Sequence, residues 1–258
     1  LDLLLGDQLG QGRTGFVYAV LPLSGPTGPM GSPPSLVLPP LAMKIGGRLM
    51  RGFIAREACI YDDIERLQGS VVPRCYGYFT ADIPSGTRFI WETPSASASD
   101  KDHWKFSNRL DGYPINIDVI KNKISVLLLE RLTGEIFPTN YTQDEKCADE
   151  VYDLFREISH RSIDHLDVAP RNIIRAMPPS PEYPHLPSHT LGKTFRYRII
   201  DFEQSHKHNI SFNYHFLQAL FPEIEGMFED LDRKRPVEAF PGGPRSTLVG
   251  SWPSSRAP

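Results

Sequence analysis

Short apolar runs separated by polar turns are the first regular feature of this chain. Such runs, rich in β-branched, aromatic or leucine side chains, fit a pleated and half-buried surface and predict β-strands. They cover residues 16–20, 41–45, 124–132, 173–175 and 197–200. The last two are short and strand-like, so we expect them to pair as a hairpin.

A helical repeat follows the second run. Between residues 53 and 67, apolar side chains recur every three or four positions, at Ile54, Ala58, Tyr61 and Ile64. This spacing predicts an amphipathic helix. Glu57 lies on the same face and Glu65 falls near it. A carboxylate on a buried face needs a counter-charge, so we expect one of the two to contact a basic side chain.

Two further helices are predicted towards the C-terminal end. The first has one apolar face made by Ala148, Val151, Leu154, Phe155 and Ile158. The second is expected to begin at Pro222, with acidic residues in its first turn and basic residues at its end, and to stop before Pro236. Proline is favoured at the first helical position, and these charges match the helix dipole.

Segments rich in Pro, Gly or Ser interrupt this pattern. They span about residues 24–40, 93–122 and 177–190, and we expect them to be mobile loops inserted into the fold. Residues 236–258 have the composition of a disordered tail.

The turn before residue 16 contains three glycines, Gly10, Gly12 and Gly15, and Val17 completes a GxGxxGxV pattern. Glycines at this spacing let a backbone approach phosphate groups. A dinucleotide-binding turn would need a helix to open at the third glycine. A strand-like run and several prolines follow instead, which excludes that interpretation.

Lys44 lies in the second predicted strand. A lone lysine in an apolar strand is usually a surface residue whose stem is buried, so its role depends on a carboxylate partner. Periodicity leaves both Glu57 and Glu65 open as that partner.

Asp167, Asn172 and Asp201 are the strongest candidates for chemistry. The predicted hairpin would bring Asn172 and Asp201 to the same end. A carboxylate and an amide oxygen suit Mg²⁺, which takes few protein ligands beside substrate phosphates. Asp167 would accept a proton from a hydroxyl group. Taken singly, each of these residues is equally typical of a turn.

Together, and in this order, the motifs resemble those of the protein-kinase-like superfamily over about residues 5–235, including its divergent fungal-type members. The resemblance implies an α+β, bilobal fold, with a small antiparallel β lobe over residues 1–129 and a mainly helical, shortened large lobe over residues 130–235. It implies ATP and Mg²⁺ as cofactors, and His165 as a structural residue that ties the catalytic loop to the Asp-Phe pair.

The resemblance also carries residue roles. Lys44 would pair with Glu57, chosen over Glu65 because Glu57 and the residues after it are similar to the corresponding kinase helix. Asp167 would be the base, and Asn172 and Asp201 would hold the metal. The residues around ATP would be Gly10, Gly12, Gly15, Val17, Ala42, Lys44, Glu130 and Leu132.

Departures from the family's pattern bear on the acceptor. Leu166 stands where many protein kinases have arginine, so a phosphorylated activation loop would lack its usual partner. Ala169 replaces a lysine that contacts the transferred phosphate, and Arg171 is the candidate to take its place. Glu203 follows the Asp-Phe pair in place of glycine, which is similar to choline and aminoglycoside kinases.

These features predict an ATP-dependent phosphotransferase that transfers the γ-phosphate to a hydroxyl group of a protein or small molecule. Two alternatives stay open. A small-molecule kinase is favoured by the Asp-Phe-Glu sequence and by the short C-terminal region. A pseudokinase acting as a nucleotide-binding regulator is compatible with the insertions.

Composition narrows the partners and the compartment. A formal net charge of −3 argues against nucleic acid or an anionic membrane as a partner. The three cysteines, Cys59, Cys75 and Cys147, are widely spaced, which is typical of a reducing compartment. No apolar run has the length needed to cross a bilayer. We therefore expect an intracellular, cytoplasmic protein.

Overall fold

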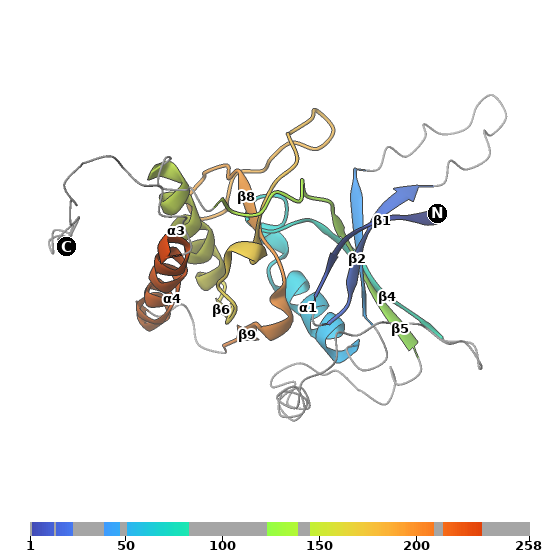
Figure 1. Cartoon of the computed structure of the whole chain (residues 1–258), viewed down its shortest axis with the longest axis horizontal. Helices are drawn as coiled ribbons and strands as arrows, with labels where there is room; N and C mark the ends of the chain where they lie inside the picture. The colour runs from blue at the N-terminus through green and yellow to red at the C-terminus, as the bar shows by residue number, and fades with distance from the viewer. Residues whose placement is uncertain are drawn as a thin grey trace, which may run out of the picture.

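The computed structural model describes residues 2–12, 14–22, 39–46, 51–82, 123–138, 145–208 and 214–233. Within these residues the chain is a mixed α/β protein with a five-stranded antiparallel sheet and three α-helices. The sheet lies at one end of the molecule, and helices α3 and α4 lie at the other (Figure 1). Of the insertion predicted at 24–40, residues 24–38 fall outside the described residues, as do the predicted insertion at 93–122 and the predicted tail at 236–258.

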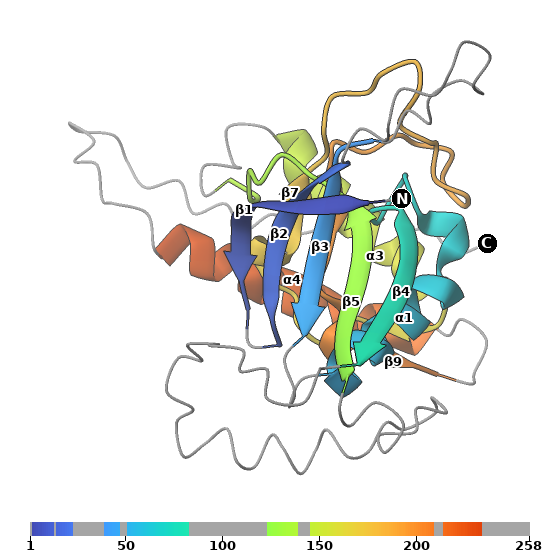
Figure 2. The same ribbon diagram turned by 90° about the vertical axis from the view of Figure 1, so that its right-hand side faces the viewer.

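The sheet has the strand order β1-β2-β3-β5-β4 (Figure 2). Its strands are β1 (Leu3–Gln11), β2 (Phe16–Pro22), β3 (Leu41–Gly46), β4 (Cys75–Asp82) and β5 (Lys123–Glu130). The predictions for β2, β3 and β5 are confirmed. The two edge strands were not predicted, because glycines and polar residues break their alternation and register shifts interrupt their pairing.

Helix α1 (Arg51–Asp63) packs against β3, β4 and β5, and a single 3-10 turn, Glu65–Leu67, follows it. Gly46, at the end of β3, explains this close approach, because a Cβ atom there would lie 2.6 Å from the Ile54 side chain. The predicted helix over residues 53–67 is therefore confirmed, although its last turn is 3-10 rather than α.

The remaining elements combine two helices with short strands. Helix α3 spans Glu145–Ser159, as predicted, and helix α4 spans Tyr214–Arg233. The predicted hairpin is confirmed as β7 (Ile173–Arg175) paired with β8 (Tyr197–Ile199). A second small pair joins β6 (Ile163–Asp164) to β9 (His206–Lys207).

The prediction that Pro222 begins the last helix is wrong. Helix α4 starts at Tyr214, and Pro222 is an exposed residue in its interior. Leu220, two residues before the proline, is buried, as are Ile224, Met227, Phe228 and Leu231 after it. Burial of this apolar face therefore outweighs the cost of an interior proline, about 3 kcal/mol.

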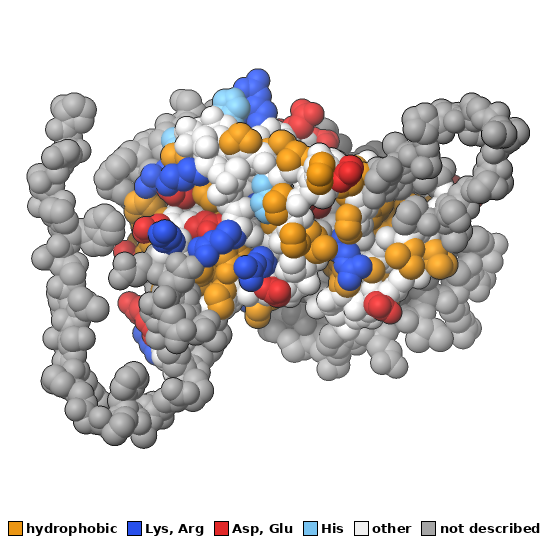
Figure 3. Space-filling model, turned by 90° about the horizontal axis from the view of Figure 1, so that it is seen from above, with side chains coloured by type: hydrophobic (Ala, Val, Ile, Leu, Met, Phe, Trp, Pro, Cys, Tyr) orange, Lys and Arg blue, Asp and Glu red, His pale blue; other side chains and the backbone are white. Residues whose placement is uncertain are grey.

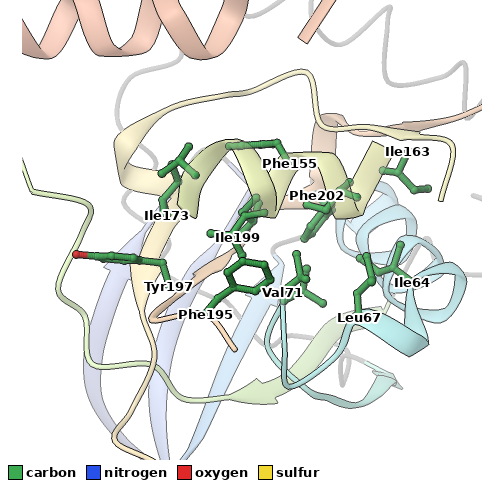
Figure 4. Packing of buried hydrophobic residues seen from close by; sticks show 14 of the residues in the cluster. Ile64, Leu67, Val71, Phe155, Ile163, Ile173, Phe195, Tyr197, Ile199 and Phe202 are labelled. Atoms are coloured by element: carbon green, nitrogen blue, oxygen red, sulfur yellow. The ribbon is translucent and has the colours of Figure 1, made fainter. Parts of the chain in front are cut away.

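One hydrophobic core joins the two ends of the molecule. The segment that follows α1 contributes Ile64, Leu67 and Val71, which lie close to Ile199 and Phe202 (Figure 4). A smaller cluster of Val20, Leu41 and Leu128 lies within the sheet. The segment that leads to Asp201 is therefore packed directly against the segment that follows α1.

The predicted insertion at 177–190 contains no helix or strand. It is attached to the turn after α1, because Arg74 Nη2 donates a hydrogen bond to the Pro184 carbonyl (2.8 Å) and Leu186 N–H donates one to the Gly69 carbonyl (3.2 Å). Among the described helices, none is long and apolar enough to cross a membrane.

Candidate functional site

Lys44 is the centre of a buried charged cluster. Its Nζ atom lies 2.6 Å from a carboxylate oxygen of Glu57, 2.7 Å from Asp201 and 3.6 Å from Glu203. The lysine comes from β3, Glu57 from α1 and the two other carboxylates from the segment after β8. Glu65 is exposed, so the partner chosen by resemblance, Glu57, is the one that contacts Lys44.

The sheet fixes the direction of Lys44. In β3, Ala42, Lys44 and Gly46 alternate with the intervening residues and so share one face. Gly46 meets the Ile54 side chain of α1 on that face, which places Lys44 on the side of the sheet that α1 covers. Glu57 lies one turn further along α1, which explains the short contact between the two side chains.

Asp201 has a left-handed backbone conformation, with φ 68° and ψ 65°. Such a conformation is uncommon for a residue other than glycine. The residues before it are held from several sides: Ile199 N–H donates to the Val71 carbonyl (2.9 Å), and Ile200 N–H donates to the Asn172 carbonyl (2.9 Å). Asp201 is therefore presented to Lys44 by a fixed backbone.

The surplus of carboxylates around one ammonium group shapes the acidities. Burial alone would lower the pKa of Lys44, but the surrounding carboxylates, Glu57 foremost, outweigh burial and raise it. Burial raises the pKa of Glu57 to about 7, against the opposing effect of Lys44. Burial also disfavours ionised Asp201, yet Lys44 lowers the pKa of that carboxyl group below its usual value. Of Glu57 and Asp201, Asp201 is thus the carboxylate that stays ionised and Glu57 the one that takes up a proton first as the pH falls.

Asp167 belongs to a second group of polar contacts, on the turn before β7. Asn172 Nδ2 donates to the Asp167 carboxylate (3.0 Å) and to the Asp167 backbone carbonyl (2.9 Å). Arg171 donates to the other carboxylate oxygen (2.6 Å), and its side chain is 66% exposed. This arrangement orients Asp167 and keeps a cation beside it. The preceding residue, Leu166, has φ 56° and is exposed.

His165 ties this turn to the segment that leads to Asp201. Its Nε2 atom lies 2.9 Å from the Ile200 carbonyl, and its ring packs edge to face on Phe202 with centroids 5.0 Å apart. Tyr61 of α1 also packs edge to face on Phe202, with ring centroids 5.5 Å apart. The structural role expected for His165 is present in this geometry.

The glycine-rich turn folds down onto the charged cluster. Thr14 is fully buried, and its hydroxyl donates a short hydrogen bond to Glu203. Gly15 has a steric reason to lack a side chain, because a Cβ atom there would lie 2.1 Å from the Ile45 carbonyl oxygen. At Gly10 and Gly12 a Cβ would meet nothing within 4 Å. The Thr14 contact was missed in the sequence, where Glu203 stood out only as a departure from the family's pattern.

The other residues expected around ATP lie on or directly after strands β2, β3 and β5. Ala42 is buried, and Val17 and Leu132 are partly buried. The Glu130 carboxylate faces Arg74, with an ion pair of 3.2 Å. The N–H groups of Glu130 and Arg131 donate to the carbonyls of Arg74 (2.8 Å) and Pro40 (2.9 Å). These two donors are therefore already bonded within the protein.

The chemistry of the donor set fits Mg²⁺. Asp201 offers a carboxylate. Because the Asn172 amide nitrogen donates to the Asp167 carboxylate and backbone carbonyl, its amide oxygen is the group available to a cation. In the described part of the chain no three His, Cys, Asp or Glu residues form a metal-binding group. Mg²⁺ needs no such cage when substrate phosphates and water complete its shell.

Comparison with known proteins adds no relative. No model of a protein family matches the chain, and no curated protein matches it. The geometry of the site therefore carries the functional argument.

Proposed function

We propose that this chain is an ATP-dependent phosphotransferase of the protein-kinase-like superfamily that transfers the γ-phosphate of ATP to a hydroxyl acceptor. The observation that carries the proposal is the position of Lys44 Nζ, 2.6 Å from Glu57 and 2.7 Å from Asp201. A lysine paired with a helix carboxylate, next to an Asp that could hold Mg²⁺, is what the proposed reaction requires.

The architecture supports a bilobal reading of the fold. The antiparallel sheet and α1 would be the small lobe, and α3, α4 and the short strands would be the shortened large lobe. The boundary would lie at the end of β5, near residues 129 and 130. Lys44 and Asp201 come from opposite sides of this boundary, which is where a substrate shared by two lobes would bind.

Each side chain has a proposed task. Lys44 would bind phosphate oxygens and Glu57 would hold it in place. Asp201 and Asn172 would hold Mg²⁺, which neutralises charge on the phosphates when it is bound. Asp167 would accept the proton of the acceptor hydroxyl, and Arg171, which is exposed beside it, would contact the transferred phosphate.

The contact between Thr14 and Glu203 favours a second candidate, a nucleotide-binding regulator of low activity. It holds the glycine-rich turn against the carboxylates where phosphates would lie.

The exposed Leu166 and the buried Glu203 favour an acceptor other than a regulated protein substrate. On the face drawn in Figure 3, described Lys and Arg side chains alternate with Asp and Glu, in keeping with the proposal that nucleic acid is not a partner.

The test is phosphate transfer from γ-labelled ATP with Mg²⁺ to a denatured proteome and to a pool of hydroxylated metabolites. Asp167→Asn should abolish transfer, and Asp164→Asn, three residues earlier, should not. Activity should survive phosphatase treatment, because Leu166 cannot pair with a phosphate. Broad protein labelling that phosphatase eliminates would point to an ordinary regulated protein kinase, and labelling that Asp167→Asn leaves unchanged would refute the role of Asp167.

A further inference from the structure

Arg198 is the largest fully buried side chain in the described part of the protein. It lies in β8, three residues before Asp201. No carboxylate among the described residues forms an ion pair with its guanidinium group, which is bonded to backbone carbonyls instead. Burial lowers the pKa of Arg198 to about 10. A cation buried without a counter-ion is costly, so we ask what the hydrogen bonds of this guanidinium group do for the structure.

The guanidinium group joins two distant segments. Its Nη1 atom donates to the carbonyls of Phe195 and Tyr197, both at 2.9 Å. Its Nη2 atom donates to the carbonyl of Gly69 at 3.0 Å. The first two bonds lie within the same hairpin arm, whereas Gly69 belongs to the turn that follows α1. The planar fork of arginine can reach all three carbonyls at once.

The turn at Gly69 is shaped to receive this bond. Gly69 has φ +75°, a conformation that other residues rarely adopt, and its N–H donates to the Val72 carbonyl (2.8 Å). Two residues further on, the Val71 carbonyl accepts the N–H of Ile199 (2.9 Å). The segment after α1 is thus attached to β8 at two adjacent positions, one through a side chain and one through the backbone.

These attachments connect the two segments that carry the carboxylates bonded to Lys44. Glu57 is on α1, which leads into the Gly69 turn, and Asp201 follows β8. From Arg198 to Asp201 each residue is bonded to another segment: Gly69, Val71, Asn172 and Lys44 in turn. A displacement of the Gly69 turn relative to β8 would therefore separate Glu57 from Asp201.

We propose that Arg198 is a positioning residue that acts through the Gly69 carbonyl to keep both Glu57 and Asp201 in contact with Lys44. The inference rests on the proposed function only in assigning this geometry to nucleotide binding. The attachment itself is a property of the protein without nucleotide.

The test follows the acylation of Lys44 in nucleotide-free protein, measured by peptide mass spectrometry in Arg198→Met, Arg198→Lys and wild type. Lys44 should react slowly in wild type, because it is buried between carboxylates. Of the three bonds that Arg198→Met removes, the one to Gly69 joins the two segments. A hydrogen bond from a charged group shifts an equilibrium by about tenfold or more, so Arg198→Met should label Lys44 at least about ten times faster. Arg198→Lys should fall between, because an ammonium group lacks the fork. Arg175→Met, in the paired strand of the same hairpin, should label at the wild-type rate.

Labelling is compared under conditions where circular dichroism shows each variant to be folded. A variant that is less stable yet labels Lys44 at the wild-type rate would overturn the proposal, since Arg198 would then only stabilise the fold. If Arg198→Met does not fold, Arg198→Lys alone decides, because its unchanged rate would be the same contradiction. Failure of wild type to bind Mg-ATP would refute the proposed function, but it would leave the comparison of Lys44 labelling rates unchanged.

Discussion

The buried charges around Lys44 do not balance, and this imbalance governs how the site behaves. Three carboxylates lie within 3.6 Å of one ammonium group. Like charges that share a site disfavour ionisation of one another, and a proton or a bound cation relieves the repulsion. A site built to receive Mg²⁺ is expected to have this surplus when no cation is present.

Glu57 should therefore make the stability of the protein depend on pH. Its pKa is raised to about 7 in the folded protein from 4.5, so the folded state retains a proton that the unfolded chain has lost. The stabilisation that comes from protonated Glu57 in the folded protein is complete below pH 4.5 and is lost as the pH rises to about 7. Glu57→Gln cannot lose a proton, so its free energy of unfolding relative to wild type should rise across this range by on the order of 1–3 kcal/mol.

Urea unfolding of both proteins at several pH values measures this difference. Glu65→Gln, which removes an exposed carboxylate near the same helix, should show no such trend. A difference between Glu57→Gln and wild type that stays constant from pH 4 to pH 8, or that falls as the pH rises, would contradict the assignment of the proton to Glu57.

Thr14 offers a second test at a single residue. Thr14→Val keeps the shape of the side chain but removes the hydroxyl group that contacts Glu203. If this contact holds the glycine-rich turn closed, amide hydrogen exchange in residues 10–17 should become faster in Thr14→Val, and Thr14→Ser should resemble wild type. Equal exchange in all three proteins would show that the contact does not hold the turn.

Among the elements, local pattern predicted those whose side chains have one clear environment. Helix α3 and strands β2, β3, β5, β7 and β8 followed from periodicity. The edge strands β1 and β4 did not, because a strand paired on one side tolerates glycine and polar residues. Lys44, Glu57 and Asp201 could each be identified in the sequence. The bonds from Thr14 to Glu203 and from Arg198 to Gly69 could not, because they join residues 189 and 129 positions apart.

Helix α4 shows where local rules fail. Proline at 222 signals a helix start in the sequence, whereas the structure continues the helix for eight residues before it. Pro222→Ala should restore a backbone hydrogen bond and stabilise the protein by about 1–3 kcal/mol. Gly226→Ala, where a Cβ atom meets nothing within 4 Å, should stabilise it by about 1 kcal/mol.

Thermal unfolding of both variants decides between the two helix boundaries. A rise in Tm for Pro222→Ala supports an interior proline, and Glu225→Ala, on the exposed face, should change Tm little. If Pro222→Ala lowers Tm while Gly226→Ala raises it, the helix begins at the proline as the sequence alone predicted.

At the scale of the whole molecule, one core fixes the relation between the sheet and the helices. The turn after α1 packs on β8 through apolar contacts and through hydrogen bonds, so Lys44, Glu57 and Asp201 are held by a single folded unit. The central claim is that this unit binds Mg-ATP. Ligand at about 100 times its dissociation constant should stabilise the fold by about 2.7 kcal/mol, a rise in Tm of about 5–11 °C for a protein of this size.

Calorimetric titration of ATP, with Mg²⁺ and with a chelator, into wild type and Asp201→Asn tests that claim most directly. Wild type should bind ATP more tightly with Mg²⁺ than without, and Asp201→Asn should lose that difference while remaining folded. Asp164→Asn should keep it. No binding by wild type at millimolar Mg-ATP, in a folded sample free of copurified nucleotide, would contradict the account, as would an unchanged effect of Mg²⁺ in Asp201→Asn.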